Sequence, residues 1–237
     1  MQRSSTNTAA LDAIYRRRFS AEAPRNLAWR RGLWKVLVDD FFSRWIPADG
    51  TVLDYGCGLG EFIHAARARR RIAVDLRDSV KDHLEPGIEF LLADAAWTEK
   101  LGEASVDVVF CSNLLEHLPD RRTLLAVFED FRRVLGPRGR LLVLGPNLRY
   151  TGAAYWDFFD HVLPLTHLSL AEALQVAGFE VEELVPRFLP YTAVGKRSLT
   201  PLSLVRWYLR LPVLWKLLGA QFFAVARPAA EALDRAE

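Results

Sequence analysis

Three acidic side chains and a glycine-rich turn stand where strand-like apolar segments of the chain end. Asp54 ends the first segment and is followed by a glycine turn at 56–60, while Asp75 and Asp94 end the next two segments. Glycine adopts positive φ, and its missing Cβ lets backbone N–H groups come close to a ligand. An acid after the second strand can accept hydrogen bonds from the hydroxyls of a ribose. One after the third strand can accept a hydrogen bond from an exocyclic amine such as that of adenine. Together they suit a nucleoside that carries a cationic tail.

Short apolar runs predict the strands that must position these residues. Nearly continuous apolar runs are typical of strands covered on both faces, and they stand at 51–55, 72–76, 88–93, 106–111, 140–144 and 221–226. We predict a helix over 120–135, capped by Asp120 and stopped by Gly136-Pro137. We predict another over 169–178, where Ser169 and Glu172 form a capping-box pattern.

Alternating β and α units of this kind predict an α/β fold with a doubly wound, Rossmann-like, mostly parallel sheet and helices on both faces. We expect a single domain over 24–228, between a flexible segment at 1–23 and a tail at 229–237. Two parts lie outside the alternating core. Residues 24–46 form an N-terminal helical extension, and residues 199–219 form a helical insertion before the last strand.

Composition excludes several classes of protein. The chain is 51% hydrophobic and 25% charged, which is the balance of a globular protein and not of a disordered one. A net charge of +2 is too small to indicate nucleic-acid binding. Cys57 and Cys111 fall in or beside predicted buried strands, so we expect a reducing, cytoplasmic location and not a disulfide framework. No apolar run is long enough to predict a transmembrane helix.

Five motifs occur in an order that resembles a known family. They are VLDYGCGLGEF at 52–62, AVDL with Asp75, LLADA with Asp94, VDVVFCSNLLEHLPD, and LGPRGRLLVLGPN. Over roughly residues 50–185 the chain resembles the class I S-adenosylmethionine (SAM)-dependent methyltransferases, particularly the bacterial small-molecule and sugar-type group. The resemblance implies a seven-stranded sheet and SAM as the cofactor. A dinucleotide-binding oxidoreductase is the competing interpretation, but its G-x-G-x-x-G fingerprint needs a glycine where this chain has Glu61.

The resemblance also implies which residues hold SAM. The amino-acid part is held by Asp54 and by the turn residues Gly56, Cys57, Gly58 and Gly60. Asp75 takes the ribose and Leu76 packs on the adenine, whose edge is read by Asp94 and by the N–H of Ala95. The backbone of Asn113 lies near the methionine part.

Methyl transfer from a sulfonium is an in-line substitution with a good leaving group, so the protein chiefly aligns the reactants, which can supply about 7–11 kcal/mol. A hydroxyl nucleophile also benefits from a base, typically by 10²- to 10⁴-fold, and histidine is the commonest base. We expect the base to be His161, His167 or His117, with His161 favoured and a packing role as the alternative for His117. Tyr155 and Asp160 could orient a substrate or a histidine.

We therefore predict transfer of a methyl group from SAM to a hydroxyl of a small molecule, such as a sugar or a lipid-linked glycan. The alternatives are a quinone or secondary-metabolite O- or N-methyltransferase and a noncatalytic protein that binds SAM or a nucleotide. We expect no metal, because the spacing of Glu116, His117 and Asp120 matches no familiar ligand motif. Nucleic-acid base methylation is disfavoured, because Ser112-Asn113-Leu114-Leu115 replaces the D/N/S-P-P-Y/F element that amino-directed enzymes carry after the fourth strand.

The insertion at 199–219 bears on the acceptor. It combines basic and aromatic side chains with an apolar majority, and Pro212 is expected to break it into two helices. Further basic residues gather near the N-terminus: Arg16, Arg17, Arg18, Arg25, Arg30, Arg31 and Lys35. The insertion is a helix packed on the sheet edge, a lid, or a segment that rests on a membrane. From the last of these we expect peripheral contact with the inner membrane face.

Overall fold

The sheet has the seven strands that the resemblance implied. A computed structural model describes residues 24–191 and 200–230, so the expected flexible segment 1–23 and the tail beyond residue 230 lie outside the described residues. The strands are β1 (Thr51–Tyr55), β2 (Arg70–Asp75), β3 (Ile88–Leu92), β4 (Val106–Ser112), β5 (Leu135–Pro146), β6 (Phe179–Val185) and β7 (Gln221–Pro228). Their order is β3-β2-β1-β4-β5-β7-β6, and β7 runs antiparallel to both of its neighbours. The doubly wound, mostly parallel fold is confirmed.

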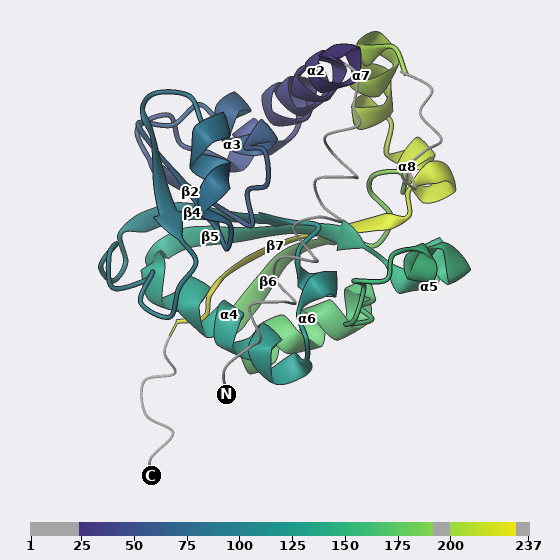
Figure 1. Cartoon of the computed structure of the whole chain (residues 1–237). Helices are drawn as coiled ribbons and strands as arrows, with labels where there is room; N and C mark the ends of the chain where they lie inside the picture. The colour runs from purple at the N-terminus through teal and green to yellow at the C-terminus, as the bar shows by residue number, and fades with distance from the viewer. Residues whose placement is uncertain (1–23, 192–199, 231–237) are drawn as a thin grey trace.

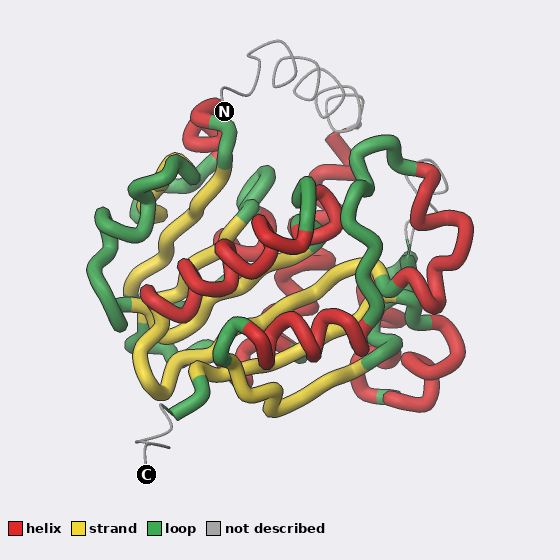
Figure 2. Tube along the Cα trace, turned by 90° about the horizontal axis from the view of Figure 1, so that it is seen from below, coloured by secondary structure: helices red, strands yellow, loops and turns green. Residues whose placement is uncertain are grey.

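Helices cover both faces of this sheet (Figure 1). On one face lie α2 (Pro24–Asp40), α3 (Glu61–Ala65) and α7 (Leu202–Arg210), and on the other lie α4 (Arg121–Val134) and α6 (His167–Val176). Figure 2 shows the helices of the second face lying over the strands. Two more helices, α5 (Leu148–Thr151) and α8 (Pro212–Leu218), lie near the end of β5 (Figure 1). Each face has its own apolar core, so the sheet is buried on both sides.

The chain departs from the predicted boundaries at three places. Helix α4 starts after its predicted cap Asp120 but passes directly into β5, so Gly136-Pro137 lies within a strand and does not stop the helix. Helix α6 begins at His167, because Thr166 is the cap and Ser169 completes the capping box; Glu172 has no part in it. Strand β6 matches no continuous apolar run, because its sequence FEVEELV alternates buried and more exposed residues.

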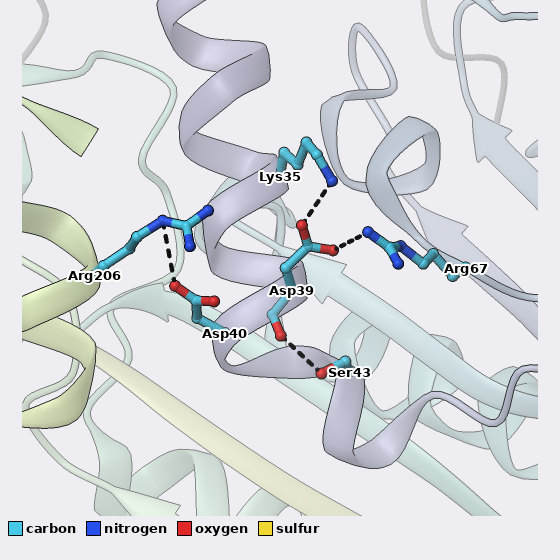
Figure 3. A network of polar contacts seen from close by, with 6 residues as sticks. All are labelled: Lys35, Asp39, Asp40, Ser43, Arg67 and Arg206. Carbon is cyan, nitrogen blue, oxygen red and sulfur yellow. Dashed lines mark hydrogen bonds and ion pairs between the residues drawn. The ribbon is translucent and has the colours of Figure 1, made fainter. Parts of the chain in front are cut away.

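The helical extension and the insertion pack against each other (Figure 1). Residues 24–46 form α2 and the short 3₁₀ helix η1 (Phe42–Trp45), and the insertion forms α7 and α8, with Pro212 at the start of α8 as predicted. Figure 3 shows the polar contacts along α2: Asp40 pairs with Arg206 of α7, and Asp39 pairs with Lys35 and Arg67. These pairs are at the surface.

We expect aromatic packing, and not these ion pairs, to hold α2 on the sheet. Phe42 is fully buried, with its ring 5.2 Å from Phe110 of β4 and 5.5 Å from Phe223 of β7. Phe42→Ala should lower the free energy of unfolding by about 3–5 kcal/mol, whereas Arg206→Ala should lower it by less than about 1 kcal/mol because the pair is exposed. Urea unfolding of the two variants measures both values. Equal losses would contradict the expectation.

Candidate active site

The predicted cofactor residues lie where the strand order reverses. In doubly wound sheets ligands bind beyond the carboxyl ends of the strands at this switch point. Here it lies between β1 and β4, which are hydrogen-bonded neighbours. The glycine turn 56–60 follows β1, and Asn113 follows β4. Both segments therefore leave the sheet at the same edge.

All three glycines of the turn have positive φ, but the chain itself needs only two of them to lack a side chain. A Cβ on Gly56 would lie 2.9 Å from both methyl carbons of Leu114, and one on Gly60 would lie 2.8 Å from a methyl carbon of Leu84. A Cβ on Gly58, where φ is +57°, would meet nothing within 4 Å. The turn therefore holds an open cradle at Gly58, which a ligand can enter.

Asp75 lies directly behind that cradle. One of its carboxylate oxygens accepts a hydrogen bond from the Gly58 N–H at 3.0 Å. The other accepts hydrogen bonds from the backbone N–H of Arg77 at 3.0 Å and from its guanidinium at 3.2 Å. The sequence placed Asp75 at the site but gave no sign that Arg77 would orient its carboxylate.

The first strand brings a second buried carboxylate to the turn. Asp54 is 3% exposed, and burial raises its pKa well above the usual range; the negative charges of Glu61 and Asp75 raise it further, against a backbone hydrogen bond from Ile63. A cationic group of a ligand would relieve this excess of negative charge. Glu61 itself is held by Arg30 of α2 at 2.5 Å, a contact across the fold that the sequence did not predict.

The residues expected around adenine lie at the exits of β2 and β3. Leu76 is 72% exposed, an unusual position for a large apolar side chain and one suited to covering a ring. Asp94 and Ala95 are both exposed. The carboxylate of Asp94 accepts hydrogen bonds from Lys100 at 2.8 Å and from the Ala96 N–H at 3.0 Å. The Lys100 hydrogen bond lowers the pKa of Asp94. The adenine assignments stay predictions.

Two further residues of the expected set shape the turn. Cys57 is buried, and burial raises the pKa of its thiol, so it is a packing residue in thiol form. Asn113 has φ of +50°, a conformation that asparagine tolerates better than most residues. Its N–H donates to the carbonyl oxygen of Leu144 at 2.8 Å, which places Leu114 over Gly56.

Beyond Asn113 the structure gathers four polar side chains, which we call the His117 cluster: Glu116, His117, Asp160 and His161. Glu116 and His117 belong to the 3₁₀ helix η3 (Leu115–His117), and the other two belong to the loop after η4 (Gly152–Asp157). Nδ1 of His117 lies 3.2 Å from the Asp160 carboxylate and 3.0 Å from its backbone oxygen. The two imidazole rings are 4.9 Å apart. Sequence reasoning ranked these histidines separately and did not predict that they meet.

The loop is fixed to the end of β4 by its backbone. The carbonyl oxygen of Glu116 accepts hydrogen bonds from the N–H groups of Val162 and Leu163 at 2.8 and 3.0 Å. Burial raises the pKa of the Glu116 carboxyl to about 7. For His117, burial lowers the pKa, but the hydrogen bond to Asp160 and the charges of Glu116 and Asp160 raise it overall.

The remaining predicted residues have structural contacts. His167 is the first residue of α6, and its Nδ1 accepts a hydrogen bond from the Asn147 amide at 3.0 Å. Burial, with help from Arg149, lowers the pKa of His167. Tyr155 is fully buried and donates its hydroxyl to the carbonyl oxygen of Leu163. Their proposed catalytic and substrate roles stay predictions.

Three of the cluster residues could hold a metal ion. Glu116, His117 and His161 each offer one ligand atom, and these atoms all lie within 4.8 Å of one another. Asp120, whose spacing from Glu116 and His117 predicted no metal site, caps α4 as expected by accepting the N–H of Thr123 at 2.7 Å. The third candidate ligand is His161, which is distant in the sequence from the other two.

Comparison with known proteins identifies the family. The family model described as a methyltransferase domain matches residues 27–184. A Mycolicibacterium smegmatis protein named "Probable S-adenosylmethionine-dependent methyltransferase" is 36% identical over 145 residues, which are 58% of this chain and 54% of that protein. A Xylella fastidiosa ubiquinone biosynthesis O-methyltransferase is 35% identical over 172 residues, covering 61% of this chain and 67% of that protein. The matched region thus spans about half of the mycobacterial relative.

Solved structures share the fold. A SAM-dependent methyltransferase from Archaeoglobus fulgidus aligns with a TM-score of 0.61 at 18% identity, over 83% of this chain and 94% of that one. One from Thermotoga maritima aligns with a TM-score of 0.62 at 16% identity, over 90% and 98%. With the family match and the cradle at Gly58, the class is defined: this is a class I SAM-dependent methyltransferase fold. The chain belongs to that family of enzymes, and SAM is its cofactor.

The described part of the chain offers no membrane-crossing element: none of its helices combines the length and the apolar character that crossing a bilayer requires.

Proposed function

We propose that this enzyme transfers the methyl group of SAM to a hydroxyl oxygen of a small, amphiphilic acceptor. The observation that carries the proposal is the position of the His117 cluster. The cluster follows β4, which pairs with β1, the strand that leads into the glycine turn 56–60. The hydrogen bond from the N–H of Asn113 fixes the segment between β4 and the cluster. A cofactor cradle and a polar centre thus share one edge of the sheet.

The residues present fit SAM. Gly58 leaves the space that the cofactor would enter, Asp75 offers carboxylate oxygens beside it, and a cationic ligand group would favour the ionised form of the buried Asp54 carboxyl. Bound SAM supplies a sulfonium methyl group and a neutral thioether as leaving group. The work left to the chain is to hold the acceptor oxygen in line with the methyl carbon, which is worth about 7–11 kcal/mol.

The His117 cluster is the place where the hydroxyl loses its proton. As the oxygen–carbon bond forms and the carbon–sulfur bond breaks, the hydroxyl proton must leave the oxygen. Asp160 holds Nδ1 of His117, so the Nε2 atom of the ring faces away from Asp160 toward Glu116, 4.0 Å distant. A neutral acceptor hydroxyl therefore meets imidazole and carboxylate groups that favour its ionisation.

An amphiphilic acceptor is supported by the surface of α7 and α8. The large apolar side chains that they and the residue between them expose are Leu204, Trp207, Leu211, Val213, Leu217 and Leu218. Residues 202–218 contain three basic residues and no acidic one. Exposed apolar side chains with basic neighbours suit an anionic lipid surface. We propose that this face rests on such a surface, where a lipid-linked glycan or a quinol would be presented.

Two acceptor chemistries remain to be separated. The hydroxyl of a sugar in a lipid-linked glycan was the acceptor expected from the family resemblance. A phenolic hydroxyl of a quinol precursor is favoured by the Xylella relative, whose name assigns it to ubiquinone biosynthesis. A methyl-transfer screen with radiolabelled SAM over sugar nucleotides, lipid-linked glycans and polyprenylated phenols tests both. Label in either hydroxyl class supports the proposal, and SAM binding without transfer to any of them would favour a noncatalytic SAM-binding protein.

The membrane contact has its own test. The full chain should float with phosphatidylglycerol vesicles and stay behind with phosphatidylcholine vesicles. A Trp207→Ser, Leu217→Ser double variant should lose flotation, because both side chains are more than half exposed and their loss leaves the core intact. Arg227→Ser, which removes an exposed cation from β7, serves as the control. Absence of flotation by the unmodified chain would refute the contact.

A further inference from the structure

The His117 cluster has the composition of a metal site that keeps an open position. Two imidazoles and one carboxylate converge, with one ligand atom from each of Glu116, His117 and His161 inside a 4.8 Å span. Two histidines and one glutamate leave a fourth coordination position to water or substrate in catalytic zinc sites. In this chain the three residues come from two separate segments, η3 and the loop after η4. The set is therefore a product of the tertiary fold and not of a local sequence pattern.

Asp160 gives His117 the orientation that a metal-binding histidine requires. Metal-bound histidines almost always donate their second ring N–H to a carboxylate or a backbone carbonyl. Nδ1 of His117 lies 3.2 Å from the Asp160 carboxylate and 3.0 Å from the Asp160 backbone oxygen, so both kinds of acceptor face it. Nδ1 therefore carries the hydrogen, and the lone pair is on Nε2. Nε2 is the nitrogen that lies toward the Glu116 carboxylate, at 4.0 Å.

A divalent cation would stabilise the buried Glu116 side chain as a carboxylate. Glu116 is 3% exposed, and His161 beside it is 7% exposed. A buried carboxylate is costly unless it is paired or coordinates a metal. The loop that carries Asp160 and His161 is tied to this residue through hydrogen bonds from Val162 and Leu163 to the Glu116 carbonyl oxygen. The two backbone segments that carry the ligands are thus joined before any ion arrives.

The spacing requires only a small closure. Imidazole nitrogen and carboxylate oxygen bind zinc at about 2.0–2.2 Å, so two ligands of one ion lie no more than about 4.4 Å apart. The Glu116 and His117 atoms already satisfy this at 4.0 Å. Rotation of the side chains within the 4.8 Å group brings in the third ligand.

We propose that Glu116, His117 and His161 bind one divalent transition-metal ion, with Asp160 as the positioning residue. Imidazole ligands favour zinc, cobalt or a similar ion over magnesium, which prefers oxygen. This inference rests on the proposed function for its role: the acceptor's hydroxyl oxygen takes the open position. With the ion bound, His117 and Glu116 would be ligands and not proton acceptors, so the hydroxyl proton would pass to solvent water as the oxygen forms its bond to the methyl carbon and the carbon–sulfur bond of SAM breaks.

The test measures ion binding without acceptor or SAM. The full chain, stripped with chelator and dialysed, is titrated with Co²⁺ by visible absorption and with Zn²⁺ by calorimetry. We expect one ion per chain, a visible cobalt spectrum and much weaker binding of Mg²⁺. His161→Ala and Glu116→Gln should each weaken Zn²⁺ binding at least tenfold, and Asp160→Asn should weaken it by about 10- to 100-fold.

Two matched controls separate this site from general metal affinity. His83→Ala removes an exposed histidine, and Asp120→Ala removes the carboxylate that caps α4; both should bind Zn²⁺ like the unmodified chain. Stoichiometric binding that survives His161→Ala and Glu116→Gln, or no binding at all, would overturn the proposal. If a variant fails to fold, X-ray absorption of the zinc-loaded unmodified chain decides, since two imidazole ligands are expected and none would refute the site.

The metal proposal and the methyl-transfer proposal can fail separately. Zinc binding with no methylated product from any hydroxyl acceptor would overturn the proposed function and leave the ion site standing. Full transfer by chelator-stripped enzyme that binds no zinc would overturn the ion site and leave the proposed function standing.

Discussion

Gly58→Ala should weaken SAM binding by at least tenfold while leaving the fold intact. The added Cβ meets no atom of the chain within 4 Å, so it creates no internal clash. It does project into the open cradle that we assign to the cofactor. The positive φ of +57° costs roughly 1–2 kcal/mol for a non-glycine residue. Calorimetric titration with SAM measures the affinity, and urea unfolding measures the strain.

Gly102→Ala is the matched control for this experiment. Gly102 also has positive φ, +82°, and a Cβ there would likewise meet nothing within 4 Å. It lies before β4, at the opposite end of that strand from Asn113. We expect a similar loss of stability from Gly102→Ala and unchanged SAM affinity. If the two variants bind SAM equally well, the cradle at Gly58 is not the cofactor site.

The sequence could propose the cofactor side of the site because its signals are local. A glycine turn after a buried strand requires positive φ, and acids at the ends of consecutive parallel strands must reach one edge of the sheet. Both features depend on residues close in sequence to the strands that carry them. The fold class followed in the same way, from apolar runs whose two-sided burial the structure bears out.

The His117 cluster was less predictable because its contacts are distant in sequence. Asp160 and His117 are 43 residues apart, and no pattern in either segment predicts that they pair. The same holds for Arg30, which reaches Glu61 from the N-terminal extension. The local pattern around Glu116, His117 and Asp120 predicted no metal site, and Asp120 is the helix cap that the sequence did predict. Only the tertiary fold brings His161 next to Glu116 and His117.

Asp75→Ala should weaken SAM binding by roughly 100-fold or more. Hydrogen bonds to a charged group contribute about 1.5–3 kcal/mol each, and a carboxylate at this position can accept two from a ribose. Its oxygens now accept hydrogen bonds from the Gly58 N–H and from Arg77, so the variant also removes the support of the cradle. Asp75→Asn keeps one acceptor oxygen, and its SAM affinity should fall between those of Asp75→Ala and the unmodified chain.

Asp78→Ala supplies the control for the loss of a nearby carboxylate. Asp78 stands three residues further along, with a side chain 63% exposed and paired with Lys81. Its removal changes the net charge as much as Asp75→Ala does, so any general electrostatic effect on a cationic ligand appears in both variants. Calorimetry should show a SAM affinity near that of the unmodified chain for Asp78→Ala. Equal affinities in Asp75→Ala and Asp78→Ala would refute the ribose assignment, and a folding defect confined to Asp75→Ala would show that its carboxylate chiefly supports the turn.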